Sequence, residues 1–376
     1  QIIGKEDAYL DYLEQALDIL TFLTFYPDTI SESLWELFPM IFMAFDQWAY
    51  DYLNLMVPPL ENFIGKAPQK FLQGSAVIPN RGTVSYIDMI FDIVAKTVSQ
   101  EQASEGEVRK ALTLYLSILH NCRGQVDQYL PMINENCLGK LGQQVKNEFP
   151  HTRIAIFQVI GSALHYNPAL ELAELEKRGA TAQVLTQWST DAEKMEKWLP
   201  QQISVLGLTS ILQLQTSAMP PSIANAIVPL ITVLTKLCEK MKEDLDHEPQ
   251  DEIEDDDLGA SEDDDFEGFG EDQDVHDSTH DDYMNAIKNL GSTSDIRFLI
   301  GDWPEDDDDD EMYSSPLDDI NQLLFFSDTM REAFAREPVV YQQVQASLPP
   351  EVVASCQKLF AAADLERQSP EIVQPK

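Results

Sequence analysis

Helix follows helix through most of this sequence, and that succession limits the fold more than any other feature. Between residues 6 and 244, apolar side chains recur at three- and four-residue spacing in one segment after another, with short connections between segments. The first run includes Leu13, Leu17 and Leu20 and is broken at Pro27. No convincing pair of strands appears in this part, so the sequence predicts an all-α fold.

The lengths and connections of these segments indicate a repeat architecture. Ser31 is the expected N-cap of a helix that continues to Phe45, a third helix runs from Tyr50 to Phe63, and the Gly- and Pro-containing stretch 64–82 is expected to be a loop. Paired helices, one pair per roughly 40 residues, are typical of a HEAT-repeat α-solenoid, a superhelix of antiparallel helix pairs. An irregular all-α domain is the alternative, because no exact repeat is visible. Further helices are expected at 83–99, 106–121, 125–146, 150–166, 168–178, 181–197, 200–214 and 221–244.

The charge is concentrated in one segment. Of the 65 acidic residues, 33 lie between Glu243 and Asp328, where only Lys288 and Arg297 are basic, so this stretch carries −31 of the formal −40. Self-repulsion and low aliphatic content predict that residues 245–315 form a long acidic, largely disordered low-complexity insertion. Its charge favours basic proteins as partners and argues against direct binding of nucleic acid or an anionic membrane.

After the acidic segment the helical pattern returns. Pro316 is the expected start of a helix that includes Leu317, Ile320, Leu324 and Phe334. Because the chain starts at Gln1 in helical context and not at Met, we expect it to be part of a longer protein. A short helix is also expected over 282–290. The predicted domains are HEAT-type helical repeats over 1–244, the acidic loop over 245–315, a carboxy-terminal helical capping unit over 316–368 and a tail over 369–376.

The acidic loop contains the candidate binding residues. Flexible carboxylates can neutralise Lys and Arg side chains of a partner without requiring one geometry, and the interleaved aromatic rings can dock on apolar patches. The alternative is a solvated segment that only maintains solubility. Ser261 precedes three acidic residues, a favourable context for phosphorylation by an acid-directed kinase. The expected cargo-binding residues are Asp255, Asp256, Asp257, Asp263, Asp264, Asp265, Phe266, Phe269, Trp303, Asp306, Asp307, Asp308, Asp309 and Asp310.

Catalysis, cofactor binding and metal binding find no support in the sequence. It contains no Gly-rich phosphate loop, no GxSxG motif, no CxxC pair and no window with the ligand order of an EF-hand. No apolar run reaches the roughly 18 residues of a membrane span. The four cysteines are expected to be reduced thiols, and the histidines within helices are expected to be cap or core groups. The tryptophans are expected in the core, and the Lys and Arg residues of the helices are expected to be ordinary surface charges. These residues are Cys122, Cys137, Cys238 and Cys356; His120, His151 and His165; Trp35, Trp48, Trp188 and Trp198; and Arg109, Lys110, Lys140, Lys146 and Arg153.

Five stretches, taken in order, resemble one protein family. They are Cys122-Arg-Gly-Gln-Val-Asp-Gln-Tyr-Leu-Pro131; Ala163-Leu-His-Tyr-Asn-Pro168 with Leu175-Glu176; Gln187-Trp188 with Val205-Leu-Gly-Leu208; Pro316-Leu-Asp-Asp319; and Glu337-Pro-Val-Val-Tyr341. Together they resemble the carboxy-terminal third of the importin-seven and importin-eight branch of the importin-β (karyopherin-β) superfamily. The short tail after Glu366 departs from the family pattern, which has a Gly- and Phe-containing extension there.

The resemblance implies a HEAT superhelix that shuttles between cytoplasm and nucleus, carries basic cargo such as histones and ribosomal proteins, and releases it when Ran-GTP binds. The family's Ran-binding repeats lie mainly in the amino-terminal half of such receptors, so no primary Ran site is expected here. Phe266-Glu-Gly-Phe-Gly270 is faintly similar to the Phe-Gly motifs that importin-β recognises, which adds importin-β and Phe-Gly nucleoporins as weaker partner hypotheses. A histone chaperone, a HEAT scaffold of a regulatory complex, and an acidic loop that autoinhibits by folding back on the helices remain as alternatives.

Overall fold

The computed structural model describes residues 12–143, 150–192, 194–247 and 315–368. Helices dominate this part, with one antiparallel hairpin of strands β1 (Ser75–Ile78) and β2 (Gly82–Ser85). Three short 3-10 helices are η2 (Tyr50–Tyr52), η3 (Asp127–Tyr129) and η4 (Thr216–Ala218). The α-helices are α1 (Leu13–Phe25), α2 (Glu32–Trp35), α3 (Phe38–Gln47), α4 (Leu53–Lys66), α5 (Pro68–Gln73), α6 (Tyr86–Ser99), α7 (Glu105–Asn121), α8 (Leu130–Gln143), α9 (Pro150–Tyr166), α10 (Pro168–Lys177), α11 (Thr181–Ala192), α12 (Trp198–Ile211), α13 (Pro221–Ala224), α14 (Ile227–His247), α17 (Gln322–Arg336), α18 (Pro338–Ser347) and α19 (Pro350–Gln368).

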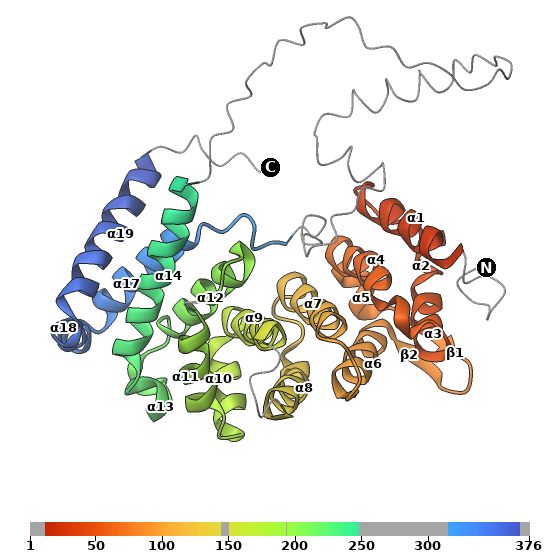
Figure 1. Ribbon diagram of the computed structural model, residues 1–376, viewed down its shortest axis with the longest axis horizontal. Helices are drawn as coiled ribbons and strands as arrows, with labels where there is room; N and C mark the ends of the chain where they lie inside the picture. The colour runs from red at the N-terminus through yellow and green to blue at the C-terminus, as the bar shows by residue number, and fades with distance from the viewer. Residues whose placement is uncertain (1–11, 144–149, 193, 248–314, 369–376) are drawn as a thin grey trace, which may run out of the picture. The chain divides into compact units, whose positions relative to one another are not determined.

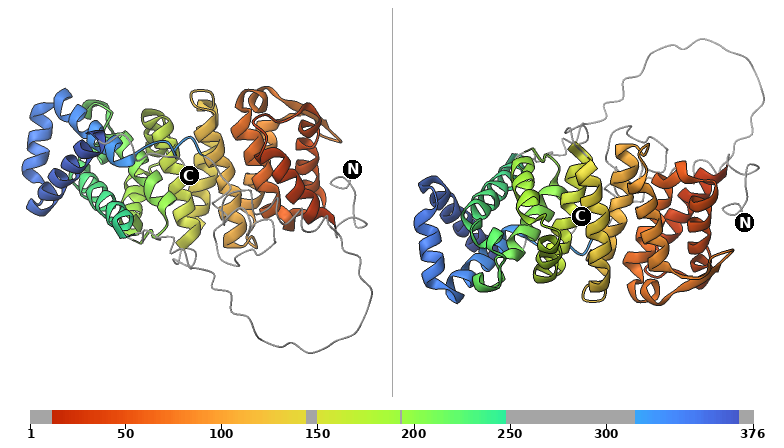
Figure 2. Two further views of the ribbon diagram at one scale, coloured as in Figure 1. Left: turned by 90° about the horizontal axis from the view of Figure 1, so that it is seen from above. Right: turned by 90° about the horizontal axis from the view of Figure 1, so that it is seen from below.

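The helices stack in two layers that follow the order of the chain (Figure 1). In the first layer α1, α4, α7, α9 and α12 contact one another in turn, and in the second layer α3, α6, α8, α10 and α11 do so. The last helices, α17 and α19, pack against α12 and α14 (Figure 2). Buried apolar residues from both layers form one continuous core, as expected when each helix pair is stabilised by its neighbours. The predicted all-α, HEAT-like solenoid is confirmed.

Capping residues fix where several helices begin. At the start of α7, Ser104 Oγ accepts a hydrogen bond from Glu107 N at 3.2 Å, and the Glu107 carboxylate accepts from Ser104 N at 2.7 Å. This reciprocal pair satisfies two amide groups that have no partner inside the helix. Asn167 caps α10 in a similar way by accepting from Leu170 N at 3.2 Å. These local bonds set the register of helices whose apolar faces then meet in the core.

Helices α9 and α12 approach each other closely at two glycines. A Cβ atom built on Gly207 would lie 2.5 Å from the carbonyl oxygen of Gly161 and 2.6 Å from its Cα. Only glycine permits the two backbones to approach this closely, because any larger residue at position 207 places its Cβ inside the backbone of the other helix. The Gly207 contact therefore determines how tightly the centre of the first layer is packed.

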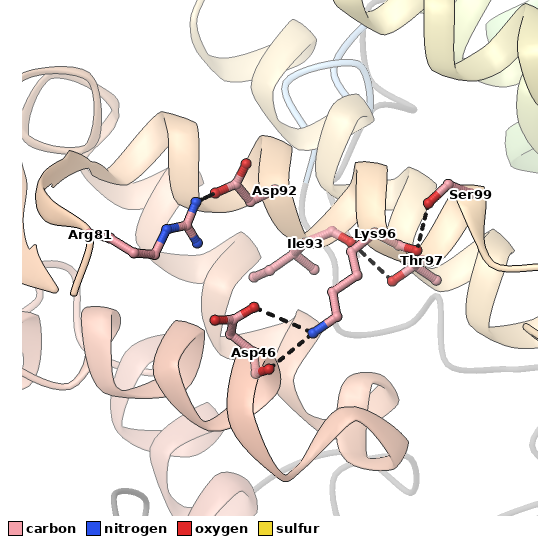
Figure 3. Close-up of polar contacts among 7 residues, drawn as sticks. All are labelled: Asp46, Arg81, Asp92, Ile93, Lys96, Thr97 and Ser99. Carbon is pink, nitrogen blue, oxygen red and sulfur yellow. Dashed lines mark hydrogen bonds and ion pairs between the residues drawn. The ribbon is translucent and has the colours of Figure 1, made fainter. Parts of the chain in front are cut away.

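The prediction of a loop over residues 64–82 is wrong. The stretch contains the end of α4, helix α5 and the β1–β2 hairpin, whose turn places Asn80 at a φ of 63°. Arg81 in this turn pairs with Asp92 of α6, as Figure 3 shows, and its guanidinium lies 5.2 Å from the centre of the Phe42 ring. The strands are only four residues long, which is too short for an alternating apolar pattern to be recognised, and contacts with α3 and α6 stabilise them.

Figure 3 also shows how α6 is tied to α3. Lys96 Nζ donates to the backbone carbonyl of Asp46 at 3.0 Å and to its carboxylate Oδ1 at 3.3 Å. Thr97 Oγ1 donates to the carbonyl of Ile93 within the same helix. A cation at the carboxy-terminal end of α3 interacts favourably with the unpaired carbonyl groups there, so Lys96 stabilises α3 as well as its own helix.

Several predicted helix boundaries were also wrong. The helix expected from Ser31 to Phe45 is divided into α2 and α3, because Pro39 has no amide hydrogen to donate to the carbonyl of Trp35. Ser31 does occupy the N-cap position of α2, but its hydroxyl makes no capping bond. Similarly, the helix expected from position 221 is divided into α13 and α14.

The carboxy-terminal helix starts later than predicted. Helix α17 begins at Gln322 and not at Pro316, because Asn321 supplies the cap by accepting from Leu324 N at 2.9 Å. Leu317 and Ile320 therefore precede the helix in which they were expected. The helix expected over 282–290 lies outside the described residues.

Two residues are buried differently from expectation. Arg153, expected on the surface, is only 5% exposed, and its Nε donates to Asp191 Oδ2 at 2.5 Å. Trp198, expected in the core, is 40% exposed at the start of α12, whereas Trp35 and Trp188 are buried as predicted. Apolar periodicity does not reveal a buried ion pair, because the cation's partner lies on another helix. The four cysteines are unpaired and buried.

Candidate functional site

The cargo-binding residues predicted from the sequence lie outside the described residues, as does Ser261. They are the aspartates from Asp255 to Asp310, together with Phe266, Phe269 and Trp303. The structure does describe the residues on either side. On the amino-terminal side the chain leaves α14, which ends at His247. On the carboxy-terminal side the described residues begin again at Ser315. Residues 315–321, which we call the strap, connect the acidic segment to α17.

The strap is bound to the first layer of the solenoid, which it crosses beside α9 and α12 (Figure 2). Leu317 is 2% exposed and belongs to the main core. Gln202 of α12 is also buried, and its side-chain Nε2 donates to the carbonyl oxygens of Leu317 at 3.1 Å and Ile320 at 3.3 Å. One amide group of α12 thus satisfies two backbone carbonyls of a segment that has no regular structure.

Ser315 is held in a buried polar cluster between α7 and α9. Its Oγ lies 3.0 Å from His120 Nδ1, while His120 Nε2 lies 2.8 Å from Ser162 Oγ. Ser315 Oγ also accepts from Leu317 N at 3.1 Å, and Ser315 N donates to Asp318 Oδ2 at 2.7 Å. Ser315 is 4% exposed and His120 is 5% exposed. A neutral imidazole donates from one ring nitrogen and accepts at the other, so one tautomer of His120 can bond to both hydroxyls.

Burial keeps the two histidines of this region neutral. Burial, with smaller contributions from the nearby His165 and Arg123, lowers the pKa of His120 to about 3. Burial likewise lowers the pKa of His165 to about 4, with a smaller contribution from Arg123. His165 Nδ1 lies 3.1 Å from Ser210 Oγ of α12. The prediction that these histidines are core or cap groups agrees with their positions, and His120 additionally binds the strap.

A second buried polar pair links α8 to α10. Asn134 Nδ2 donates to Glu171 Oε2 at 2.7 Å, and both side chains are almost inaccessible to solvent. Burial raises the pKa of Glu171 to about 8, although the hydrogen bond from Asn134 opposes the shift. The carboxyl group is therefore protonated at neutral pH, since the Asn134 hydrogen bond and the charge of Arg178 do not compensate for its desolvation.

The strap was not predicted from the sequence, because its contacts join positions far apart in the chain. Ser315 and His120 are separated by 195 residues, and Gln202 and Leu317 by 115. One local signal was available. Ser315 and Pro316 interrupt the acidic pattern beside Leu317, and an apolar residue in such a place indicates a segment that returns to the core.

Within residues 12–143, 150–192, 194–247 and 315–368, no group of three or more His, Cys, Asp or Glu side chains could hold a metal ion. None of the described helices is both long enough and apolar enough to cross a membrane.

Comparison with known proteins identifies relatives among the importins. The probable importin-7 homolog of Dictyostelium discoideum is 28% identical over 214 residues, which cover 56% of this chain and 19% of that protein. Importin-8 of Danio rerio is 28% identical over 242 residues, covering 62% of this chain and 22% of that protein. Importin-8 of Homo sapiens is 26% identical over 236 residues, which cover 60% of this chain and 21% of that protein. The chain thus spans about a fifth of the length of the curated relatives it matches.

No family model matches the chain, and no solved structure matches it. The relationship therefore rests on aligned sequence together with a two-layer helical stack of the kind that the resemblance implies.

Proposed function

We propose that this chain, which is related in sequence to importin-7 and importin-8 of the importin-β superfamily, is part of a nuclear import receptor for basic protein cargo. The observation that carries the proposal is this relationship, at 25–28% identity over about 60% of the chain. Such a receptor is a binding protein and not an enzyme, and it shuttles between cytoplasm and nucleus. Its cargo would be released by Ran-GTP, bound mainly by repeats that this chain does not include.

The acidic segment is the proposed cargo-binding element. Residues 248–314 contain 27 acidic residues and only two basic ones. Carboxylates at this density attract cations over distances near the Debye length, which is about 8 Å at physiological salt, and speed encounter with a basic protein. The described residues that flank the segment, which end at His247 and begin again at Ser315, belong to one helical stack. Histones and ribosomal proteins carry the charge that fits this element.

A salt titration with matched variants tests the cargo role. One variant changes Asp306–Asp310 to Asn and so removes five charges from the segment. The control variant removes five charges from exposed positions outside the segment, by changing Glu36, Glu101, Glu135, Glu332 and Glu351 to Gln. Binding to linker histone and to a basic ribosomal protein should weaken in the first variant at low salt, with a smaller salt dependence, while the control binds as the unchanged chain does.

Equal loss in both variants would indicate that net charge alone, and not the segment, attracts the cargo. Unchanged binding in both would place recognition on the helices and leave the acidic segment as a solvated connection.

A histone chaperone is the second candidate function, because the same acidic segment could shield histones without any transport. The two functions differ in their response to Ran. Release of histone from the full-length protein by Ran-GTP supports an import receptor, whereas histone binding that is insensitive to Ran-GTP supports the chaperone.

A further inference from the structure

The Ser315–Pro316 pair lies where the acidic segment meets the solenoid, and the hydroxyl group of its serine is buried. The Ser315 side chain points into the cluster formed with His120 and Ser162, while Pro316 is exposed to solvent. A serine followed directly by proline is the recognition element of proline-directed protein kinases. Here the proline lies on the surface and the hydroxyl that would be modified points inward.

We propose that Ser315 is a phosphorylation site for a proline-directed kinase and that its phosphorylation releases the strap from the solenoid. In the reaction, the γ-phosphoryl group of ATP is transferred to Ser315 Oγ. The bond from the γ-phosphorus to the bridging oxygen breaks, ADP leaves, and the hydroxyl proton passes to the base of the kinase. The kinase requires an extended substrate, so it acts on molecules in which the strap has opened locally.

A phosphate group does not fit the closed site. It would add a charge of about −1.5 to −2 at pH 7 and three acceptor oxygens to a hydroxyl that is 4% exposed. His120 can offer it at most one N–H, at Nδ1, since burial keeps this imidazole neutral and Nε2 then only accepts from Ser162. The Asp318 carboxylate already accepts from the Ser315 amide, so a second anion would be placed beside it.

Arg123 is the cation of this cluster, and it is already engaged. Its Nη2 donates to the carbonyl of His165 at 2.9 Å. If Arg123 turned to bind the phosphate, phosphorylation would tighten the strap and not release it. We infer release because Asp318 and Asp319, three and four positions after Ser315, repel a dianion at position 315.

The order of events makes phosphorylation and strap opening mutually dependent. Opening exposes the hydroxyl, and the phosphate then prevents the closed state from reforming, so each step favours the other. Contacts that hold the strap should consequently slow the kinase. Gln202, whose amide donates to the carbonyls of Leu317 and Ile320, is such a contact and lies away from the residues that the kinase reads.

The experiment uses the whole chain with a proline-directed kinase, Mg²⁺ and ATP, and maps the phosphate by mass spectrometry. A Ser369→Ala background removes the other serine that precedes a proline. Phosphate is expected at Ser315, absent in Ser315→Ala and much reduced in Pro316→Ala. The Gln202→Met variant retains side-chain volume but loses the donor, and it should be phosphorylated several times faster, since loss of a typical hydrogen bond changes an opening equilibrium about fivefold.

Hydrogen exchange then reads the state of the strap. After phosphorylation the amides of Ser315 and Leu317, both of which donate in the closed strap, should exchange faster, while α4 and α6 remain unchanged. Absence of phosphate at Ser315 overturns the assignment of the site. Slower or unchanged exchange in the phosphorylated chain overturns the release and indicates that Arg123 binds the phosphate. Neither readout depends on cargo, so the result stands apart from the proposed transport function.

Discussion

Replacing Gly207 by alanine tests whether the α9–α12 contact limits the stability of the solenoid. The new Cβ would lie 2.5 Å from the Gly161 carbonyl oxygen, and ordinary contact begins at 3.4 Å, so the helices must separate by about 0.9 Å at this point. The opposing atoms belong to the backbone, which cannot escape by changing rotamer. Overpacking of this kind costs about 1–3 kcal/mol, and the upper end applies where no side chain can give way.

Alanine also favours a helix over glycine by about 1 kcal/mol, so the net loss for Gly207→Ala should be about 2 kcal/mol. Gly139→Ala is the matched control, because Gly139 lies within α8 and a Cβ there meets no heavy atom within 4 Å. Urea unfolding followed by circular dichroism should show a lower midpoint for Gly207→Ala and an equal or higher midpoint for Gly139→Ala. The reasoning fails if the two variants unfold at the same urea concentration.

Two further predictions concern buried polar groups. Burial raises the pKa of Glu171 to about 8, so the stability that its neutral form provides is present below the unfolded pKa of about 4.3 and is lost as the pH rises toward 8. The urea midpoint of the variant Glu171→Gln should therefore equal that of the unchanged chain near pH 4 and exceed it at pH 8. The same difference in urea midpoint at both pH values would contradict the assignment. Changing Asp191 to Leu removes the carboxylate that pairs with the buried Arg153 and should cost about 3–5 kcal/mol in urea unfolding. Arg81→Met breaks the exposed pair with Asp92 and should cost about 1 kcal/mol or less, and similar losses in the two variants would refute the argument from burial.

The sequence predicts those parts of the fold that depend on neighbouring residues. The α7 boundary follows from Ser104 and Glu107, which lie three positions apart and cap the helix together. The break at Pro39 was missed because the apolar pattern continues across it, and the β1–β2 hairpin was missed because its strands depend on contacts with α3 and α6. A local bond did not always make a boundary evident, since the start of α17 at the Asn321 cap was also missed, and boundaries that depend on tertiary contacts have no local signal.

The sequence predicts the composition of the candidate site, but it does not predict how the strap that follows the acidic segment binds to the helices. Charge alone identifies residues 248–314, because 27 acids with two bases cannot form a core. The burial of Ser315 depends on His120, 195 positions away, and no periodicity links the two. Arg153 shows the same limit, since its anion lies on α11 and its burial could not be inferred from α9 alone.

The strap also determines how the acidic segment can be studied. In a simple solenoid each repeat contacts only its neighbours, so a segment between repeats can be removed without affecting distant helices. Here the strap joins α7 and α12 to the chain that follows the segment, through Ser315 and Leu317. Deleting residues 243–315 would remove the Ser315 anchor, the last turn of α14 and the acidic charges together. Charge neutralisation within 248–314 changes only the electrostatic attraction, which is why the cargo experiment replaces Asp306–Asp310 by Asn and leaves both attachments intact.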